Sequence, residues 1–209
     1  MKHDYLLTEI TALQRIKKLQ YRNLVNPAGV IILSFVLNFI LPALGFISTI
    51  ALIMAIAGLI WFFIITNMHR IRNKILAPQQ DTIYCPITGK VSQIRTFEDT
   101  TQISIRKSFL DTVEIRCPHE SCVWEDGKLQ LELDGTRIQF RFTGSRVILF
   151  TEAEMKPGQV IGAIIGNGFC DIQMPVRMAP LLSSGKIVDG GESWLYKEDL
   201  IAYPVHVCY

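Results

Sequence analysis

The chain has 209 residues, of which 49% are hydrophobic and 19% are charged, and its formal net charge at pH 7 is +2. A net charge this small does not favour a nucleic-acid partner, which usually requires a strongly basic surface. Five cysteines are an odd number, which argues against a closed disulfide framework and fits a reducing compartment such as the cytosol.

Residues 1–25 have the pattern of an amphipathic helix, because leucines and isoleucines recur on one face at helical spacing. The basic residues share another face: Arg15, Lys18 and Arg22. A basic amphipathic helix beside a membrane segment is expected to lie in the plane of the interface. Packing against the soluble domain or a partner is the alternative. Asn26-Pro27 is expected to end this helix and to turn the chain into the bilayer.

The apolar block from Ala28 to Thr66 contains no ionisable side chain. As one continuous helix it would reach about 58 Å, roughly twice the hydrocarbon thickness of a bilayer. Pro42 and Gly45 offer a break, so we predict a transmembrane or re-entrant helical hairpin over residues 26–68. The second arm, from Phe46, is long enough to span at about 31 Å, whereas the first arm is marginal at about 21 Å.

Both flanks of this hairpin are basic, which by the positive-inside tendency places both ends in the cytoplasm. The basic residues are expected to meet anionic lipid, and an aromatic residue of the second arm is expected near the interface. The residues predicted to face the membrane are therefore Arg15, Lys18, Arg22, Trp61, Arg70 and Arg72.

Residues 69–81 are predicted to be a linker, and residues 82–209 a mostly β domain. Polar and apolar residues alternate in residues 128–134 and 137–142, and Asp134-Gly135 between them is a strong β-hairpin signal. No helical period of useful length appears after Thr82. The soluble part is therefore predicted to be a flattened barrel or a sandwich.

Glycines punctuate the second half of this domain, and a turn is predicted at Gly166 to Gly168. Strands interrupted by glycine turns are typical of biotinyl/lipoyl-like folds. In such a fold Lys156 would be a candidate carrier lysine, although it precedes Pro157-Gly158 and lacks the apolar frame of a hairpin tip.

Four phrases follow one another after the hairpin: Cys85-Pro-Ile-Thr-Gly-Lys-Val91, Leu110-Asp-Thr-Val-Glu-Ile-Arg-Cys-Pro118, Gly158-Gln159 with Gly166-Asn-Gly-Phe-Cys-Asp171, and Val188-Asp-Gly-Gly-Glu-Ser-Trp-Leu195. In their order and spacing the chain resembles the phosphatidylserine decarboxylases, in the short bacterial form with a membrane hairpin. The resemblance covers nearly the whole chain from Asn26. It implies an α+β membrane protein with a decarboxylase-like β domain, located at a bacterial inner membrane.

The family's chemistry depends on one serine, which cuts the backbone and becomes a pyruvoyl group that forms a Schiff base with the substrate amine. In this chain that position falls on Gly168, the family's early aspartate falls on Thr88, and its central histidine falls on Val113. Glycine has neither a hydroxyl nor a β-carbon. The resemblance therefore implies a scaffold retained without its reaction and without a cofactor.

Two other chemistries stay open. Gly144-Ser145-Arg146-Val147 spells the family's Gly-Ser-Arg-Val, so an active, pyruvoyl-dependent phospholipid decarboxylase that cleaves itself at Ser145 is the alternative. Cys117, His119 and Cys122 could supply three zinc ligands, but a closed structural site needs a fourth. Neither a serine-hydrolase elbow nor a second cysteine pair at metal spacing occurs.

The sequence thus predicts a membrane-anchored, non-catalytic protein that acts as a phospholipid-facing binding module or as an accessory subunit of a membrane complex. Its expected partners are membrane phospholipid, other proteins of such a complex and, by the resemblance, a second copy of the chain. Nucleic acid is not expected.

Overall fold

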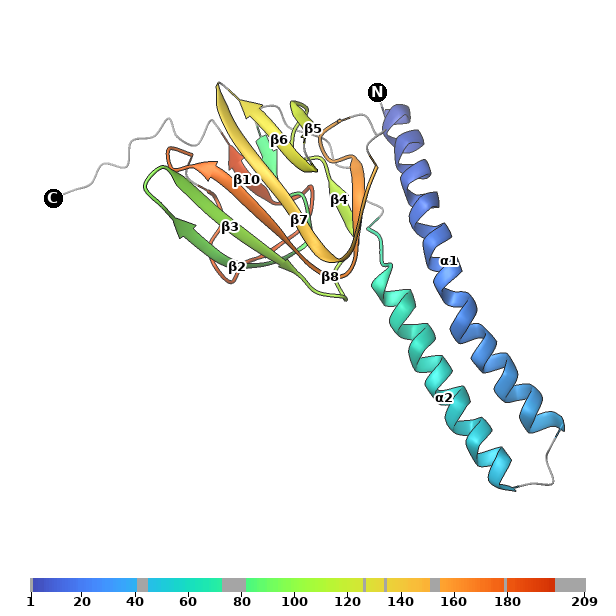
Figure 1. The fold of residues 1–209 in the computed structure, drawn as a ribbon. Helices are drawn as coiled ribbons and strands as arrows, with labels where there is room; N and C mark the ends of the chain where they lie inside the picture. The colour runs from blue at the N-terminus through green and yellow to red at the C-terminus, as the bar shows by residue number, and fades with distance from the viewer. Residues whose placement is uncertain are drawn as a thin grey trace.

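The computed structural model describes residues 2–40, 45–72, 82–125, 127–133, 135–150, 155–178 and 180–197. Two long helices, α1 (Lys2–Ile40) and α2 (Gly45–Met68), form an antiparallel pair. The N-terminal half of α1 lies beside a mostly β domain, and the rest of the pair projects away from that domain (Figure 1).

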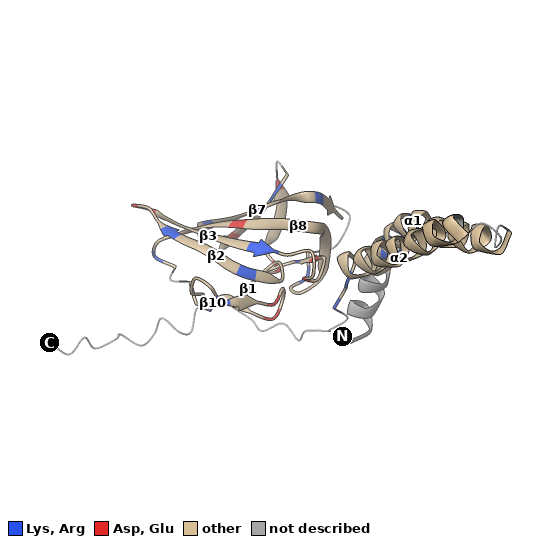
Figure 2. Ribbon diagram, turned by 90° about the horizontal axis from the view of Figure 1, so that it is seen from below, with Lys and Arg blue, Asp and Glu red and all other residues tan. Residues whose placement is uncertain are grey.

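Both helices are long and apolar enough to cross a membrane, in the segments Thr11–Ile40 and Ser48–Met68. At 1.5 Å per residue, α2 is about 36 Å long, which exceeds the hydrocarbon core of a bilayer. Large apolar side chains cover the outside of the pair; Phe46 is 78% exposed and Phe63 is 69% exposed. Away from the β domain the pair carries almost no charged residue (Figure 2). A surface of this kind is typical of helices that face lipid.

Helix α1 does not end at Asn26-Pro27, so the predicted helix stop is wrong. Proline removes one backbone hydrogen bond, to Asn23 O, and packing against α2 offsets that loss. The helices approach closely at Gly58, where a β-carbon would lie 2.8 Å from Ile31 Cγ1. Nearer the β domain, Asn23 Nδ2 lies 3.5 Å from His69 Nε2. Because α1 continues in one direction through Pro27, its first half does not lie in the plane of an interface that its second half crosses.

Helix α1 instead packs on the β domain, which is the alternative that the sequence left open. Ala12 and Ile16 are buried in a cluster with four residues of the β domain: Val113, Phe150, Val160 and Ala163. Arg15 Cζ lies 5.7 Å from the centre of the Phe150 ring, a cation–π arrangement. Arg15 is exposed and contacts a ring of the β domain, and its predicted membrane contact stays a prediction.

The β domain contains one large antiparallel sheet and one two-stranded sheet. The large sheet has the order β5-β6-β7-β8-β3-β2-β9, with β4 also paired to β8, and the small sheet pairs β1 with β10. The strands are β1 (Thr82–Tyr84), β2 (Gly89–Thr96), β3 (Thr100–Lys107), β4 (Glu114–Arg116), β5 (Cys122–Glu125), β6 (Lys128–Leu133), β7 (Thr136–Leu149), β8 (Val160–Pro175), β9 (Ile187–Val188) and β10 (Trp194–Lys197).

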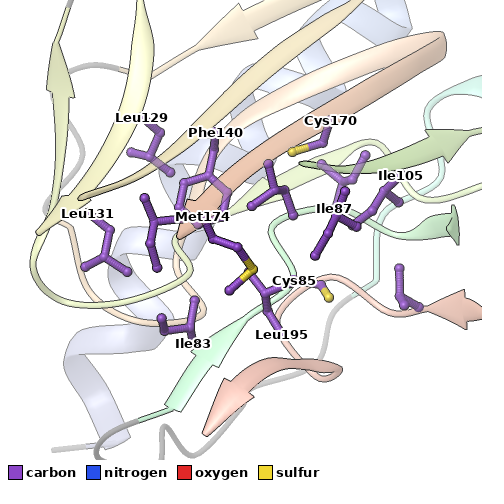
Figure 3. Packing of buried hydrophobic residues seen from close by; sticks show 14 of the residues in the cluster. Ile83, Cys85, Ile87, Ile105, Leu129, Leu131, Phe140, Cys170, Met174 and Leu195 are labelled. Atoms are coloured by element: carbon purple, nitrogen blue, oxygen red, sulfur yellow. The ribbon is translucent and has the colours of Figure 1, made fainter. Parts of the chain in front are cut away.

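The predicted hairpin between residues 128–134 and 137–142 is confirmed as β6 and β7, with Leu133 opposite Thr136. Gly135 has φ of 68°, as a tight reversal requires. Alternate residues of both strands point into the core, among them Leu131 and Phe140, both fully buried. These side chains meet Ile83 and Leu195 of the two-stranded sheet, so the core lies between the sheets (Figure 3).

The turn predicted at Gly166 to Gly168 is wrong, because β8 runs through these residues without reversing. The glycines let β7 and β8 approach closely instead. A β-carbon at Gly168 would lie 2.7 Å from Thr143 O, and one at Gly144 would lie 2.9 Å from Asn167 O. Gly166 has φ of 83°, and the β7–β8 register shifts beside it. Glycine here provides close backbone contact and a bend, and the chain does not turn back.

Candidate functional site at the junction of the helices and the β domain

The chain that leaves α2 is bound at once to the β domain. Arg70 O accepts a hydrogen bond from Val113 N at 2.9 Å, and Arg72 N donates to both carboxylate oxygens of Glu114 at 3.1 and 3.2 Å. Arg72 O accepts from Arg116 Nη2 at 2.8 Å. Residues 70–72, predicted to be part of a free linker, therefore extend the β domain; residues 73–81 lie outside the described residues.

A buried ion pair lies under this segment. Arg116 Nη2 is 3.2 Å from Glu114 Oε1, and both side chains are almost completely buried. Arg116 Nη1 donates to Gly158 O at 2.9 Å, so the guanidinium bonds β4, the α2 exit and the turn before β8. Burial raises the pKa of Glu114, and the charge and hydrogen bond of Arg116 act in the opposite direction. Each charge of the pair has the opposite charge and further hydrogen bonds as partners, which buried charges in a low dielectric require.

The Arg72 side chain faces the loop between β9 and β10. Its Nη1 atom lies 2.8 Å from Asp189 Oδ1 and 3.5 Å from Glu192 Oε1. The hydrogen bond with Asp189 is the main cause that raises the pKa of Arg72. The Arg72 charge is thus paired within the β domain, and a membrane contact of Arg72 stays a prediction. Lys18, Arg22 and Arg70 are exposed, and Trp61 is 44% exposed on α2.

Lys107 is the largest completely buried side chain of the domain, at the end of β3. Its ammonium donates to Ser108 O at 3.0 Å and to Gly166 O at 2.9 Å. No carboxylate of the described residues forms an ion pair with it. Burial lowers the pKa of Lys107 to about 8, and the more distant charges of Asp111 and Glu114 raise it in part. The alternation of Thr101, Ile103 and Ile105 on the core face was the sequence signal that could have found it.

Thr88, Val113 and Gly168, the three positions that the resemblance singled out, come to the same end of the β domain. Thr88 Oγ1 accepts from Thr112 Oγ1 and from Gly190 N, both at 3.0 Å, and Thr112 is the neighbour of Val113. Gly168 is paired with Lys107 across β8 and β3. The β3 residue before Lys107 pairs with Lys90, near the start of β2 and two residues after Thr88.

None of the three positions carries a reactive group. Thr88 is fixed in a hydroxyl network, and Val113 is buried among apolar side chains of α1 and β8. At Gly168 a β-carbon would lie 2.6 Å from Ile164 Cγ2 and 2.7 Å from Thr143 O. Real β-carbons do not approach a backbone oxygen this closely, so a serine would not fit here unless β7 moved.

Ser145 lies at the bend of β7 and is exposed. Its Oγ donates to Asn167 O at 3.4 Å, and no acidic, basic or histidine side chain of the described residues forms a hydrogen bond with it. A serine nucleophile needs a base in contact with its hydroxyl. Ser145 therefore has the position of an exposed bend residue, and the structure provides no base for it among the described residues.

Cys117 and His119 lie in the loop between β4 and β5, and Cys122 begins β5, but the three do not form a metal-binding cluster among the described residues. Cys117 Sγ donates to His119 O at 3.0 Å, and His119 Nδ1 accepts from Ser121 N at 3.1 Å. The hydrogen bond with Cys117 and burial raise the pKa of Cys122. Backbone groups of the segment thus take up the hydrogen bonds of Cys117 and His119, and the two thiols are free and buried.

The sequence missed the groups that hold this junction together. Lys107 could have been found from its strand pattern, whereas Glu114 and Arg116 belong to a three-residue strand that is buried throughout and shows no alternation. Comparison of the chain with protein-family models, with curated proteins and with solved structures gives no match in any of the three.

Proposed function

We propose that this chain is a membrane-anchored, non-catalytic relative of the phosphatidylserine decarboxylases. In this proposal α1 and α2 cross a bacterial inner membrane, and the β domain lies on the cytoplasmic side against the phospholipid head groups. There it acts as a phospholipid-facing binding module or as an accessory subunit of a membrane complex.

Anchoring is supported by the outside of the helix pair. Apolar residues are exposed along both helices up to the level of Asn23 and His69, and beyond this level the basic residues begin. Arg22 and Arg70 are exposed there, at the height expected for the head groups of one leaflet. Since both flanks are basic, the β domain and the start of α1 belong on the same side.

The observation that carries the non-catalytic part is the crowding at Gly168. In the resemblance this residue stands where a serine must supply both the attacking hydroxyl and the carbon skeleton of the pyruvoyl group. The paired strands β7 and β8 approach so closely here that no room is left for a side chain. The close approach of these two strands therefore disfavours the serine on which the reaction depends.

The alternative, an active decarboxylase that cleaves itself at Ser145, has less support. The hydroxyl of Ser145 is exposed and its hydrogen-bond partner is the carbonyl of Asn167. Self-cleavage requires the hydroxyl to attack the preceding carbonyl with help from a base.

Intact mass and denaturing gel mobility of the purified full-length protein test the proposal. We expect one uncut chain of 209 residues without an added group, and the same result for Ser145→Ala. Two chains, residues 1–144 and 145–209, with a pyruvoyl group on the second and none formed by Ser145→Ala, would establish the decarboxylase. An added prosthetic mass on Lys156 would indicate a carrier domain instead.

A further inference from the structure

The turn after β3 presents two neighbouring large apolar side chains to the outside. Phe109 is 40% exposed and Leu110 is 54% exposed. The residues on either side are polar or charged, so these two form an isolated apolar tip. Two exposed apolar side chains are too small a patch to mark a contact site by themselves, so their meaning depends on where the turn lies.

The backbone of this turn is held firmly. Asp111 Oδ2 accepts from Ser108 N at 2.7 Å, and Asp111 N donates to Ser108 O at 3.1 Å. The buried ammonium of Lys107 donates to the same Ser108 O and also to Gly166 O of β8. The tip is therefore preorganised and loses little conformational freedom when it binds.

The turn lies at the level where α2 meets the β domain. Lys107 donates to Gly166 O, and a β-carbon added at Gly166 would lie 3.4 Å from Met68 Cε at the end of α2. On the other side of the turn, Val113 N donates to Arg70 O. Figure 1 shows the turn after β3 at the edge of the β domain beside the end of α2.

We propose that the Ser108–Asp111 turn is a third membrane contact of the protein, in which Phe109 and Leu110 insert into the interfacial layer of the bilayer that α1 and α2 enter. This inference rests on the proposed anchoring. The exposed basic residues Arg70 and Arg146 lie next to this level and match an anionic lipid surface. The contact fixes the β domain at three points, so the junction site faces the head groups and the domain does not rotate about the helix pair.

The other end of β3 provides a matched control. Phe97, which is 53% exposed, bonds through its N–H to Thr100 O at the start of the strand. With about 3.3 Å per residue over the seven steps from Thr100 to Lys107, this end lies about 23 Å from Lys107. Phe97 therefore has the same chemistry as Phe109 and is expected to remain in water.

Tryptophan quenching tests the proposal in the full-length protein, reconstituted into vesicles of phosphatidylcholine and phosphatidylglycerol with brominated acyl chains. Of the three native tryptophans, Trp61 lies on α2 whereas Trp124 and Trp194 lie in the β domain, so the bromine-sensitive part of the native emission reports whether the helices are in the bilayer. We expect the emission added by Phe109→Trp to be at least twofold reduced, most by bromines near the head group. The emission added by Phe97→Trp should stay unchanged. Leu110→Trp repeats the test if Phe109→Trp does not fold.

Two negative outcomes are distinguishable. If the native emission is quenched but the added emission of Phe109→Trp and Leu110→Trp is as insensitive as that of Phe97→Trp, the turn contact is wrong and anchoring stands. If bromine quenches no part of the native emission, the helices are not in the bilayer, and both proposals are overturned.

Discussion

Two ion pairs between glutamate and arginine mark opposite regions of the β domain. Glu114–Arg116 lies at the junction with the helices, with side chains 2% and 3% exposed. Glu125–Arg137 connects β5 and β7 at the surface, with side chains more than half exposed. The first pair bonds three chain segments to one another, while the second reaches across β6, which pairs with both β5 and β7.

The difference shows where this fold depends on electrostatics. At the junction, charges are out of water and every partner lost leaves a buried charge behind. At the surface, water and salt replace a lost partner. The end of the domain near the helices therefore combines buried charge with closely packed glycines, whereas the surface around Glu125 and Arg137 is solvated.

The largest expected effect comes from breaking the buried pair. Arg116→Met leaves Glu114 buried without its partner, and we expect the unfolding free energy to fall by about 3–5 kcal/mol. Arg137→Met removes the surface partner and should cost about 0–1 kcal/mol. Thermal unfolding of the full-length protein in detergent measures both. Equal losses in the two variants would contradict the distinction between the regions.

Lys107 gives the second effect, through pH. Because its pKa in the folded state is lowered to about 8 from the ordinary 10.5, the unfolded chain binds its proton more tightly between these values. The contribution of Lys107 to the unfolding free energy should therefore rise as pH increases from about 8 to 10.5, by up to about 3 kcal/mol, while the raised pKa values of the buried thiols Cys85, Cys122 and Cys170 act in the opposite direction. Lys107→Met should remove this rise, whereas Lys90→Met at an exposed site should keep it. Unfolding midpoints at pH 7.5 and 10 for the three proteins provide the measurement.

The third effect concerns the close approach of the paired strands β7 and β8. Gly168→Ser forces a side chain against Thr143 O and Ile164, and we expect a loss of about 1–3 kcal/mol and no self-cleavage. Gly29→Ser, where a β-carbon meets nothing within 4 Å, serves as the control. Unfolding midpoint and intact mass are read on the same samples. A Gly168→Ser protein of unchanged stability that splits before residue 168 would show that only the serine was missing.

The sequence predicted the elements whose pattern is local. An uncharged apolar block of this length predicts helices that can span a membrane. Alternation around Asp134-Gly135 predicts a hairpin whatever surrounds it. The predictions from sequence are wrong at Pro27 and at Gly166 to Gly168, because proline and glycine are taken to end a helix or a strand. Contact with α2 maintains the helix at Pro27, and the neighbouring strand β7 needs the glycines for close approach.

The sequence by itself thus determined that there are two apolar helices followed by a mostly β domain, since periodicity and turn residues act over a few positions. Tertiary structure alone decided that Arg15 and Arg72 bind the β domain, that Glu114 and Arg116 are buried, and that the Ser108–Asp111 turn lies beside the end of α2. The physical reason is that a charge or an exposed apolar pair has no intrinsic preference for a partner. Its environment is set by chain segments that lie far away in the sequence.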